Sequence, residues 1–366
     1  MLSVLIKPSS SLCNMRCAYC FYHDEAQNRH VASNGIMSDE TAENLIRKAF
    51  AESDDGVLFA FQGGEPTLAG PDFFEKFVSK VNEVNVKKAP VVYTIQTNGL
   101  NIDQKWALFF RKNRFLVGLS CDGDKTVHDL LRTDTANEGT YKRVIAAAEC
   151  LKKHRVEFNI LTVVTKKVAQ NIKKVYRSFK KHGFDYIQFI PCLAPIGSCE
   201  DAPHVPDNED YYRFLSVLFE EWYEELQEGK YRSIRYFDNL YFIYKGDRAE
   251  QCGMQGRCCI QFVIESNGDV YPCDFYCLDD FLLGNINQSS FGELAQSDKA
   301  KEFLAFSEKR DECKGCEYEK YCLSGCRRYR DSGSYRYCDA SRRFYPAMLE
   351  KMPSIDRIVI NGYAKM

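Results

Sequence analysis

Six apolar, β-rich runs alternate with helical patterns over the first half of the chain, and this alternation limits the possible folds more than any other feature. The expected strands cover residues 3–7, 57–62, 91–97, 116–120, 157–164 and 186–191. Helical periodicity covers 38–53, 72–84, 140–154 and 168–182, with Ser38 or Asp39 and Thr140 as candidate N-caps. Repeated βα units build a parallel sheet covered by helices. The sequence therefore predicts an α/β fold with six βα units, an open or partial (β/α)6 barrel.

The character of the chain changes after the sixth expected strand. Residues 194–210, rich in Pro, Asp and Glu, predict a linker, and residues 210–227 predict an amphipathic helix. From about residue 248, short strands, turns and cysteines replace the βα pattern. We expect a barrel with its linker helix over 1–235, followed by a cysteine-rich domain with a C-terminal helix over 236–366.

Charge and composition exclude several classes of function. The chain has 49 Lys and Arg against 51 Asp and Glu, without long blocks of one sign, so nucleic-acid and membrane partners are not expected. No export signal and no apolar run of about 18 residues is visible, which predicts a cytoplasmic protein. Seventeen cysteines in such a chain indicate metal or redox chemistry rather than disulfides.

Three cysteines follow the first expected strand with the spacing C-x3-C-x2-C: Cys13, Cys17 and Cys20. Three thiolates can hold three irons of a [4Fe–4S] cluster and leave the fourth iron open to a ligand. A zinc site is the alternative, and it needs a fourth ligand, for which His23 is the nearby candidate.

A glycine-rich turn, Gly63-Gly64-Glu65-Pro66, follows the second expected strand. Adjacent glycines permit a close backbone approach, and a carboxylate suits an ammonium group. A plain turn without a ligand is the alternative reading of these four residues.

A second group of eight cysteines lies near the C-terminus, enough for two fully ligated cubane clusters or for two four-cysteine zinc sites. The eight are Cys252, Cys258, Cys273, Cys313, Cys316, Cys322, Cys326 and Cys338. Cys259 and Cys277 leave open which thiols act as ligands. Of the remaining cysteines, Cys121, Cys150 and Cys199 are expected to be ordinary thiols, while the role of Cys192 stays open.

The cysteine triplet, with Tyr19 before its last member and the glycine-rich turn downstream, resembles the radical SAM superfamily. In that family the open iron chelates S-adenosylmethionine (SAM), and an electron from the cluster breaks its sulfonium bond to give a 5′-deoxyadenosyl radical. The resemblance implies SAM contacts at Tyr19, Gly63, Gly64 and Glu65. Ser120 and Asp122, at the end of the fourth strand, are weaker candidates that an Asp-Gly turn explains equally well.

The eight C-terminal cysteines resemble the SPASM extension of radical SAM enzymes in their order. The resemblance implies two auxiliary clusters with interleaved ligands, one held by Cys252, Cys258, Cys273 and Cys326, the other by Cys313, Cys316, Cys322 and Cys338. Spacing alone would have paired neighbouring cysteines. The expected cofactors are SAM and three [4Fe–4S] clusters, with a low-potential electron donor such as flavodoxin or ferredoxin as a partner.

Within this superfamily the chain is most similar to the anaerobic sulfatase-maturating enzymes, through residues 17–22, 61–70, 96–99, 234–238, 252–254 and 271–276. That resemblance implies oxidation of a cysteine or serine in a sulfatase polypeptide to Cα-formylglycine. It makes Asp274 the base and places Tyr22 and Gln62 near the substrate side chain. Arg235, Tyr236 and Asp238 would help to define a peptide channel, although a buried salt bridge explains them as well.

Two alternatives to this function remain open from the sequence. The first is a radical SAM/SPASM maturase that forms a thioether crosslink or an epimer in a ribosomally made peptide. Such maturases commonly carry a winged peptide-recognition domain before the barrel, for which the position of Cys13 leaves no room. The second is a non-catalytic zinc scaffold. For Asp274 itself, the alternative to a base is an exposed aspartate in a turn. The sequence does not distinguish a cysteine target from a serine target, and we expect a monomer.

Overall fold

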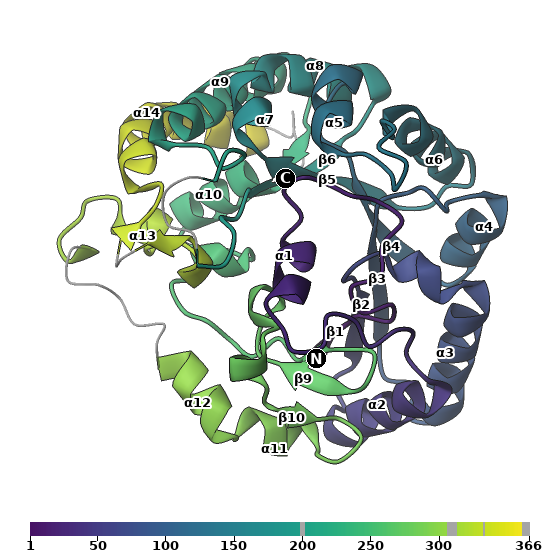
Figure 1. Ribbon diagram of the computed structural model, residues 1–366. Coiled ribbons are helices and arrows are strands. Elements are labelled where there is room, and N and C mark those ends of the chain that lie inside the picture. The colour runs from purple at the N-terminus through teal and green to yellow at the C-terminus, as the bar shows by residue number, and fades with distance from the viewer. Residues whose placement is uncertain (198–201, 306–312, 332–333, 361–366) are drawn as a thin grey trace. The chain divides into compact units, whose positions relative to one another are not determined.

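The computed structural model describes residues 1–197, 202–305, 313–331 and 334–360 (Figure 1). These residues gather into two compact units, each assembled from separate stretches of the chain. Unit 1 comprises residues 1–120, 132–158 and 259–306, and unit 2 comprises 121–131, 159–258 and 307–366. The expected division into two domains at residue 235 remains a prediction, because it divides the chain into continuous segments, whereas each compact unit combines separate stretches.

Unit 1 contains a mixed sheet with its strands in the order β10-β9-β8-β1-β2-β3-β4. The strands are β1 (Leu2–Ile6), β2 (Val57–Phe61), β3 (Val91–Thr97), β4 (Phe115–Ser120), β8 (Val263–Ile264), β9 (Asp269–Tyr271) and β10 (Gly284–Asn285). Strands β8, β1, β2, β3 and β4 are parallel, whereas β9 and β10 are antiparallel additions at the β8 edge. The late segment 259–306 therefore extends the sheet that the first 120 residues begin.

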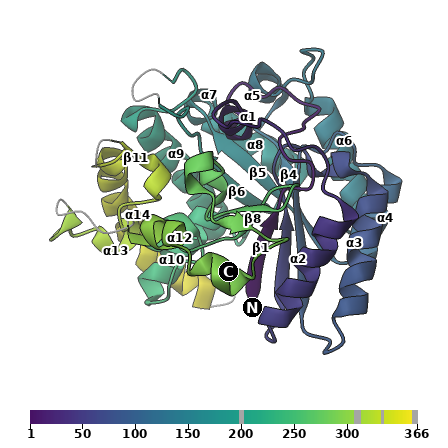
Figure 2. The same ribbon diagram turned by 60° about the horizontal axis from the view of Figure 1, so that its bottom comes forward.

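Helices cover this sheet, and in Figure 2 α2, α3 and α4 lie side by side. The helices of unit 1 are α1 (Phe21–Gln27), α2 (Asp39–Glu52), α3 (Pro71–Val84), α4 (Gln104–Lys112), α6 (Tyr141–Lys153), α11 (Phe291–Ala295) and α12 (Asp298–Ala305), with 3-10 turns η1 (Pro66–Ala69), η3 (Asp274–Tyr276) and η4 (Asp279–Phe281). Alternate residues of β2 and the inner face of α3 are aromatic and buried, notably Phe59, Phe61, Phe74 and Phe77. Their ring contacts form the core of this unit.

Unit 2 contains three parallel strands in the order β5-β6-β7. Its elements are β5 (Phe158–Val164, entering from unit 1), β6 (Tyr186–Pro191), β7 (Ser233–Ile234), β11 (Arg330–Asp331), β12 (Ser334–Tyr335), α5 (Lys125–Leu131), α7 (Lys166–Gln170), α8 (Ile172–His182), α9 (Asn208–Gln227), α10 (Arg235–Lys245), η2 (Cys252–Met254), α13 (Glu319–Cys322), η6 (Arg327–Tyr329) and α14 (Cys338–Ile360). Helix α14 packs along α9. Helices α7 and α8 also pack on α9, which makes α9 the central helix of the unit.

All six expected strands are present, each within two residues of its predicted bounds. Ser38 caps α2 as predicted, since its side chain accepts a hydrogen bond from the backbone N–H of Thr41 at 3.1 Å. Thr140 precedes α6, but capping by its side chain was wrong, because its hydroxyl donates instead to the carbonyl of Arg132 at 3.0 Å. The α/β character of the fold is therefore confirmed.

The single helix predicted over 168–182 is two helices, α7 and α8, which meet at Asn171. The Asn171 side chain donates to the carbonyl of Lys167 at 2.9 Å, and this local bond competes with continuation of the helix. The predicted linker 194–210 ends where α9 begins, and its residues 198–201, which include Cys199, lie outside the described residues. Among the helices of the described ranges, none is long and apolar enough to cross a membrane.

Candidate active site

The carboxyl ends of three neighbouring strands in unit 1 deliver polar side chains to one edge of the sheet. Lys7 follows β1, Gln62 follows β2, and Glu265 follows β8. The sheet register continues one residue past the strands, since Lys7 N–H donates to the carbonyl of Ile264 at 2.8 Å and Gln62 N–H donates to that of Ile6 at 2.9 Å. This edge of a parallel sheet is where α/β enzymes place their chemistry.

Asp274 lies at this edge, in the η3 turn directly after Cys273. Its residue is 8% exposed, so the alternative of an exposed turn aspartate is wrong. Tyr22, in α1, donates its hydroxyl to Oδ2 of Asp274 at 2.7 Å, across 252 positions of the sequence. The other oxygen, Oδ1, is buried and has no hydrogen-bond partner among the residues that the structure describes. Asp274 thus has one oxygen held by the protein and one that can accept a proton.

A buried network of charges lies beside Asp274. The ammonium of Lys7 is 2.9 Å from Oε1 of Glu265 and 3.8 Å from Oε2 of Glu25. Arg29 reaches the same Glu265 oxygen at 2.7 Å, and Oε1 of Glu25 accepts the backbone N–H of Cys277 at 3.2 Å. Two cations thus face three carboxyl groups when Asp274 is included.

The two glutamates of this network have opposite pKa shifts. Burial raises the pKa of Glu25 to about 8, so this carboxyl is mostly protonated at neutral pH. Burial acts in the same direction on Glu265, but the adjacent Lys7 and Arg29 outweigh it and lower the pKa of Glu265 to about 2. With Glu25 neutral, the two cations balance Glu265 and Asp274.

Asp274 itself is poised between its two protonation states. Burial raises the pKa of Asp274 to about 6, while the positive charge of Lys7 and the hydrogen bond from Tyr22 act to lower it. Gln62 also lies close enough to lower this pKa. Burial and the neighbouring carboxylate raise the pKa of Tyr22 well above its ordinary value, so Tyr22 remains a hydrogen-bond donor. A carboxylate in this state suits the role of a general base near neutral pH.

The cysteine triplet lies in the loop between β1 and α1, and its surroundings fit an iron–sulfur cluster. Cys13 Sγ accepts the backbone N–H of Met15 at 3.4 Å, and Cys20 interacts with the backbone N–H groups of Tyr22 and His23. The pKa of Cys13 is raised to about 12, mainly by burial and with smaller contributions from the neighbouring Cys17 and Cys20. Three such thiols become thiolates together only when a positively charged group binds them, which the irons of a cubane supply.

The glycine-rich turn after β2 packs against the loop that carries the triplet. A Cβ on Gly64 would lie 2.1 Å from the carbonyl oxygen of Leu12, immediately before Cys13. Glu65 is buried, and its Oε1 accepts from Thr67 and from the hydroxyl of Thr97 at 2.8 Å, while its Oε2 accepts the backbone N–H of Asn98 at 2.7 Å. The carboxylate thus ties the turn to the end of β3, and its expected contact with SAM remains a prediction.

Two of the other expected SAM contacts, Tyr19 and Asp122, have partners of their own. Tyr19 accepts a hydrogen bond from Arg132 at 2.9 Å within unit 1. Ser120 ends β4 in unit 1, whereas Asp122 belongs to unit 2, where its Oδ1 accepts the backbone N–H of Val163 at 3.1 Å. Asp122 also donates its backbone N–H to the ring of His128. The structure therefore gives Asp122 a local role in holding the end of β5.

Seven of the eight C-terminal cysteines lie in unit 2, and Cys273 lies in unit 1. The pKa of Cys322 is raised to about 11, mainly by burial and with smaller contributions from the nearby Cys338, Cys313 and Cys316. These four are the ones that the resemblance assigns to a single cluster. Among the described residues, no three His, Cys, Asp or Glu side chains converge closely enough to hold one metal ion. A cubane needs no such convergence, because each thiolate binds a different iron.

Cys326 belongs to the other expected set, and its neighbours in unit 2 are members of that set. Burial raises its pKa, and the nearby Cys258 adds to the shift. A Cβ on Gly253, next to Cys252, would lie 3.4 Å from that of Cys326. By contrast, Cys277 is fully buried in an apolar cluster with Val263 and Tyr271. The remaining described thiols include Cys259, which is exposed, and Cys192, which is buried in unit 2.

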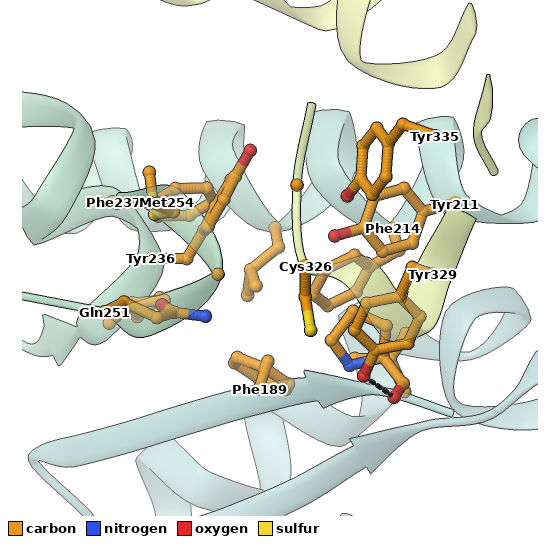
Figure 3. Close-up of a pocket in the computed structure, with 16 residues that line it drawn as sticks. Phe189, Tyr211, Phe214, Tyr236, Phe237, Gln251, Met254, Cys326, Tyr329 and Tyr335 are labelled. Carbon is orange, nitrogen blue, oxygen red and sulfur yellow. Dashed lines mark hydrogen bonds between the residues drawn. The ribbon is translucent and has the colours of Figure 1, made fainter. Parts of the chain in front are cut away.

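A cavity of about 60 Å³ in unit 2 is lined mostly by aromatic and aliphatic residues (Figure 3). Tyr211, Tyr236, Tyr329 and Tyr335 contribute to its wall, and Cys326 lies among them. Tyr329 donates its hydroxyl to the carbonyl of Pro191 at 2.6 Å, drawn as a dashed line in the figure. The cavity gives unit 2 a site in which phenols, rather than charged groups, surround a candidate cluster ligand.

The other expected channel residues are only partly associated with this cavity. Tyr236 lines it, whereas Arg235 is exposed and donates to Gln188 at 3.3 Å. Asp238 accepts hydrogen bonds from Tyr231 at 3.0 Å and Ser233 at 2.6 Å. The partners of Arg235 and Asp238 are therefore different, and the two do not form the buried salt bridge that was considered.

Sequence reasoning missed several residues of the buried site in unit 1. Lys7 and Glu25 were not considered, and Glu265 was read as part of a turn-rich segment. Asn98 was noted only as part of the motif 96–99, without a role of its own, and in the structure its amide donates to Asn14 at 2.7 Å and approaches Cys13 Sγ at 3.8 Å. The sequence held one signal for Lys7, which directly follows the apolar strand β1, where the chain is expected to be buried. A lysine is rare at such a position, so it could have been singled out.

Family comparisons agree with the two parts of the sequence pattern. A model described as the Radical SAM superfamily matches residues 8–188, and one described as an iron-sulfur cluster-binding domain, SPASM, matches residues 252–317. The first match contains the triplet and the glycine-rich turn. The second contains five of the eight C-terminal cysteines and Asp274.

Relatives of similar length carry a more specific name. Cysteine-type anaerobic sulfatase-maturating enzymes of Clostridium novyi and Clostridium perfringens are 42% and 46% identical, over 96% and 94% of this chain and 96% and 95% of theirs. A serine-type enzyme of Bacteroides thetaiotaomicron is 31% identical over 90% of this chain and 84% of its own. A solved structure described as native anSMEcpe with bound AdoMet and Cp18Cys peptide is 43% identical, with a TM-score of 0.92 over 98% of this chain and 99% of that one. The chain is therefore a radical SAM enzyme that uses SAM and [4Fe–4S] clusters, and it belongs to the anaerobic sulfatase-maturating enzymes.

Proposed function

We propose that this enzyme oxidises a cysteine in a sulfatase polypeptide to Cα-formylglycine, with Asp274 as the base. The observation that carries the proposal is the asymmetry of the Asp274 carboxylate. Tyr22 holds Oδ2 at 2.7 Å, while Oδ1 is buried without a partner among the described residues. An unsatisfied buried carboxylate oxygen is costly unless a ligand completes it, and a substrate thiol is a suitable donor.

The reaction needs a proton, a hydrogen atom and an electron to leave the same side chain. Bound SAM and the clusters supply the radical that removes the β-hydrogen and the acceptor for the remaining electron. Oδ1 of Asp274 takes the thiol proton, and the hydroxyl of Tyr22 keeps the carboxylate oriented while it does so. Loss of these particles leaves a thioaldehyde, which water hydrolyses to the aldehyde of formylglycine with release of hydrogen sulfide.

A cysteine target is favoured over a serine target by the pattern of identities. The two cysteine-type relatives are 42% and 46% identical to this chain, against 31% for the serine-type relative. The solved structure with a bound Cp18Cys peptide has a TM-score of 0.92. Both groups share the β-carbon chemistry, so the preference rests on the overall likeness of the chains.

Three further parts of the proposal concern the setting of the reaction. We infer three [4Fe–4S] clusters, one on the triplet and two on the eight C-terminal cysteines. A low-potential donor such as flavodoxin or ferredoxin would reduce the first cluster. A chain with 17 cysteines whose expected role is cluster ligation calls for a reducing compartment, which favours the cytoplasm, and the enzyme would act as a monomer.

Two peptides test the reaction and its target directly. The protein is reconstituted anaerobically and incubated with SAM, a reductant and sulfatase-motif peptides that carry either cysteine or serine. We expect formylglycine from the cysteine peptide, detected by mass, together with 5′-deoxyadenosine. Formation of 5′-deoxyadenosine without a change in either peptide would reject the proposed substrate.

The substitution Asp274→Asn tests the proposed base. It keeps the shape of the side chain but removes its basicity, so formylglycine formation should fall by about 10² to 10⁴-fold. Iron content and the reductive cleavage of SAM without peptide should stay normal. Asp280→Asn is the matched control, because Asp280 is exposed and lies only six positions away. Full activity of the Asp274→Asn variant would contradict the assignment.

A further inference from the structure

Lys7 is a buried cation for which neither the chemistry of the radical nor the proposed base provides a role. The residue is 1% exposed, and its side chain leaves β1 toward the edge that holds Asp274. Its ammonium makes an ion pair with Glu265 at 2.9 Å and lies 5.1 Å from the centre of the Tyr22 ring. A lysine is rarely buried so completely, because the loss of water around the ammonium must be offset by partners.

The geometry points to Lys7 as a positioning residue for the oxidation step: its ammonium, anchored by Glu265 against the face of Tyr22, sets the Tyr22 hydroxyl on Oδ2 of Asp274 and so leaves Oδ1 for the substrate. The assignment rests on the proposed function of Asp274. Lys7 acts through Tyr22 and is therefore not itself a catalytic residue.

The direction of the Tyr22 hydroxyl explains why a cation on the ring matters. A phenol hydroxyl lies in the plane of its ring, so the plane of the ring decides where the hydroxyl can reach. A cation near the ring face is attracted by the electrons of that face and resists tilting of the ring. The ring centre of Phe21 lies 4.0 Å from that of Tyr22, and Phe275 packs edge-to-face on Phe21 with ring centres 5.0 Å apart. Tyr22 is therefore held by Lys7 and by this aromatic pair.

The position of Lys7 is itself fixed by three features of its surroundings. Glu265 is brought beside it by the parallel pairing of β1 with β8, in which Ile6 lies opposite Ile264. Arg29 holds the same Glu265 oxygen at 2.7 Å and keeps that carboxylate from rotating away. Gly63 supplies the space, because a Cβ there would lie 2.8 Å from Cγ of Lys7. The first glycine of the glycine-rich turn thus admits the Lys7 side chain, a requirement separate from any contact with SAM.

Charge balance gives a second reason for a cation at this place. Glu25, Glu265 and Asp274 are all buried within reach of Lys7, and Arg29 is the other cation that pairs with them in the described part of the chain. Without Lys7, the Asp274 carboxylate would turn toward any remaining hydrogen-bond donor. Its Oδ2 would then no longer be reserved for Tyr22, nor its Oδ1 for the substrate. A neutral side chain of similar length cannot replace this effect.

Lys7→Met tests the inference with little change in volume. In a crystal structure of the reconstituted variant, Tyr22 should no longer be within hydrogen-bond distance of Asp274. The kcat for formylglycine should fall by about 10- to 100-fold with little change in KM for the peptide, because misplacement acts on the reacting geometry. SAM cleavage without peptide and iron content should stay normal. Lys76→Met, at an exposed lysine of α3, is the matched control.

A double-substitution cycle separates positioning from a general structural role. If Lys7 acts through the Tyr22 hydroxyl, Lys7→Met should lower kcat much less in a Tyr22→Phe background than in the wild type. Equal effects in both backgrounds would overturn the inference, as would a crystal structure of Lys7→Met with the Tyr22–Asp274 bond intact. Should that variant not fold, Glu265→Gln loosens the anchor of Lys7 while keeping its shape, and it should displace Tyr22 in the same direction.

The inference and the proposed function fail in different ways. If the wild-type enzyme leaves both peptides unchanged, the proposed function is wrong. The crystal structure of Lys7→Met still decides the positioning role in that case, because the distance between Tyr22 and Asp274 is measured without a substrate. If the peptide is converted and the bond persists in the variant, only the inference about Lys7 is wrong.

Discussion

The two units of this enzyme bury polar groups beside their candidate cluster ligands in different ways. In unit 1, Asp274 follows Cys273 and lies in a network of full charges that includes Lys7 and Glu265. In unit 2, Cys326 lies among tyrosines whose hydroxyls bond to neutral acceptors, such as that of Tyr329 on the carbonyl of Pro191. Only the first arrangement can exchange a proton near neutral pH, because phenols buried as these are remain protonated.

The difference shows what each kind of environment is suited to do. Buried charges are costly and have to be matched one by one, which makes the unit 1 site sensitive to the loss of any member that is charged at neutral pH. Buried phenols are satisfied by single hydrogen bonds, so the unit 2 cavity tolerates change more easily. Chemistry that moves protons belongs in the first environment. An aromatic wall that excludes water around a cluster belongs in the second.

Substitution of a glycine beside each group of cysteines should give the largest effects on stability and so tests this comparison first. In Gly64→Ala, the new Cβ would meet the backbone carbonyl of Leu12 at 2.1 Å, and backbone cannot move aside cheaply. We expect a loss of about 3 kcal/mol in unfolding free energy and incomplete iron loading of the triplet, measured by melting and by iron analysis.

The matched change in unit 2 is Gly325→Ala, next to Cys326. There the Cβ would meet the ring of Tyr335 at 2.4 Å, in a residue with a φ of +60°. A side-chain ring can turn away, so the cost should be about 1–2 kcal/mol, mainly from the left-handed backbone. A larger loss in Gly325→Ala than in Gly64→Ala would reverse the expected order of the two sites.

Tyr329→Phe measures how much a single buried phenol contributes to unit 2. The substitution leaves the carbonyl of Pro191 without the hydroxyl that lies 2.6 Å away. Unfolding free energy should fall by about 1–2 kcal/mol, without a dependence on pH below the range where phenols ionise. Thermal melting at several pH values checks both statements. A pH-dependent loss would show that the tyrosine cavity is coupled to charged groups after all.

Glu25→Gln should have the smallest effect at neutral pH but a characteristic pH dependence. The folded-state pKa of Glu25 is raised from 4.5 to about 8, so its contribution to stability is full below the unfolded value and is lost as pH rises through about 8. Its charged neighbours are Lys7, Arg29 and Asp274. The glutamine variant resembles the protonated form, so it should lose less than about 1 kcal/mol at neutral pH.

Measuring the unfolding free energy of the wild type and of Glu25→Gln across pH isolates the contribution of the Glu25 carboxyl. As pH rises from about 6 to about 8, the unfolding free energy of Glu25→Gln should gain on that of the wild type. Equal slopes for both proteins would mean that Glu25 is already ionised in the folded enzyme. That result would leave three negative charges facing two cations, and the account of charge balance at Asp274 would need revision.

The sequence alone determined the features that depend on short distances along the chain. The six strands follow from alternating apolar residues, as in Val57, Phe59 and Phe61 of β2, which are buried on one face. The triplet and the glycine-rich turn are recognisable because their chemistry requires fixed spacing within a loop. Asp274 could be singled out because it adjoins Cys273 in a motif that resembles a known family. Thr140 occupies the predicted N-cap position of α6, but its hydroxyl does not cap the helix because it donates to the carbonyl of Arg132, eight positions earlier.

Only the tertiary structure decided which groups surround Asp274. Tyr22 is 252 positions away in the sequence, and Glu265 reaches Lys7 through the pairing of β8 with β1. No local pattern encodes such a register, since it depends on how the late segment 259–306 joins the sheet that the N-terminus begins. A buried lysine also contradicts the general preference of its residue type and becomes explicable only once its partners are known. The spacing of the cysteines thus predicts the cluster ligands, whereas long-range packing decides which residues surround the base, Asp274.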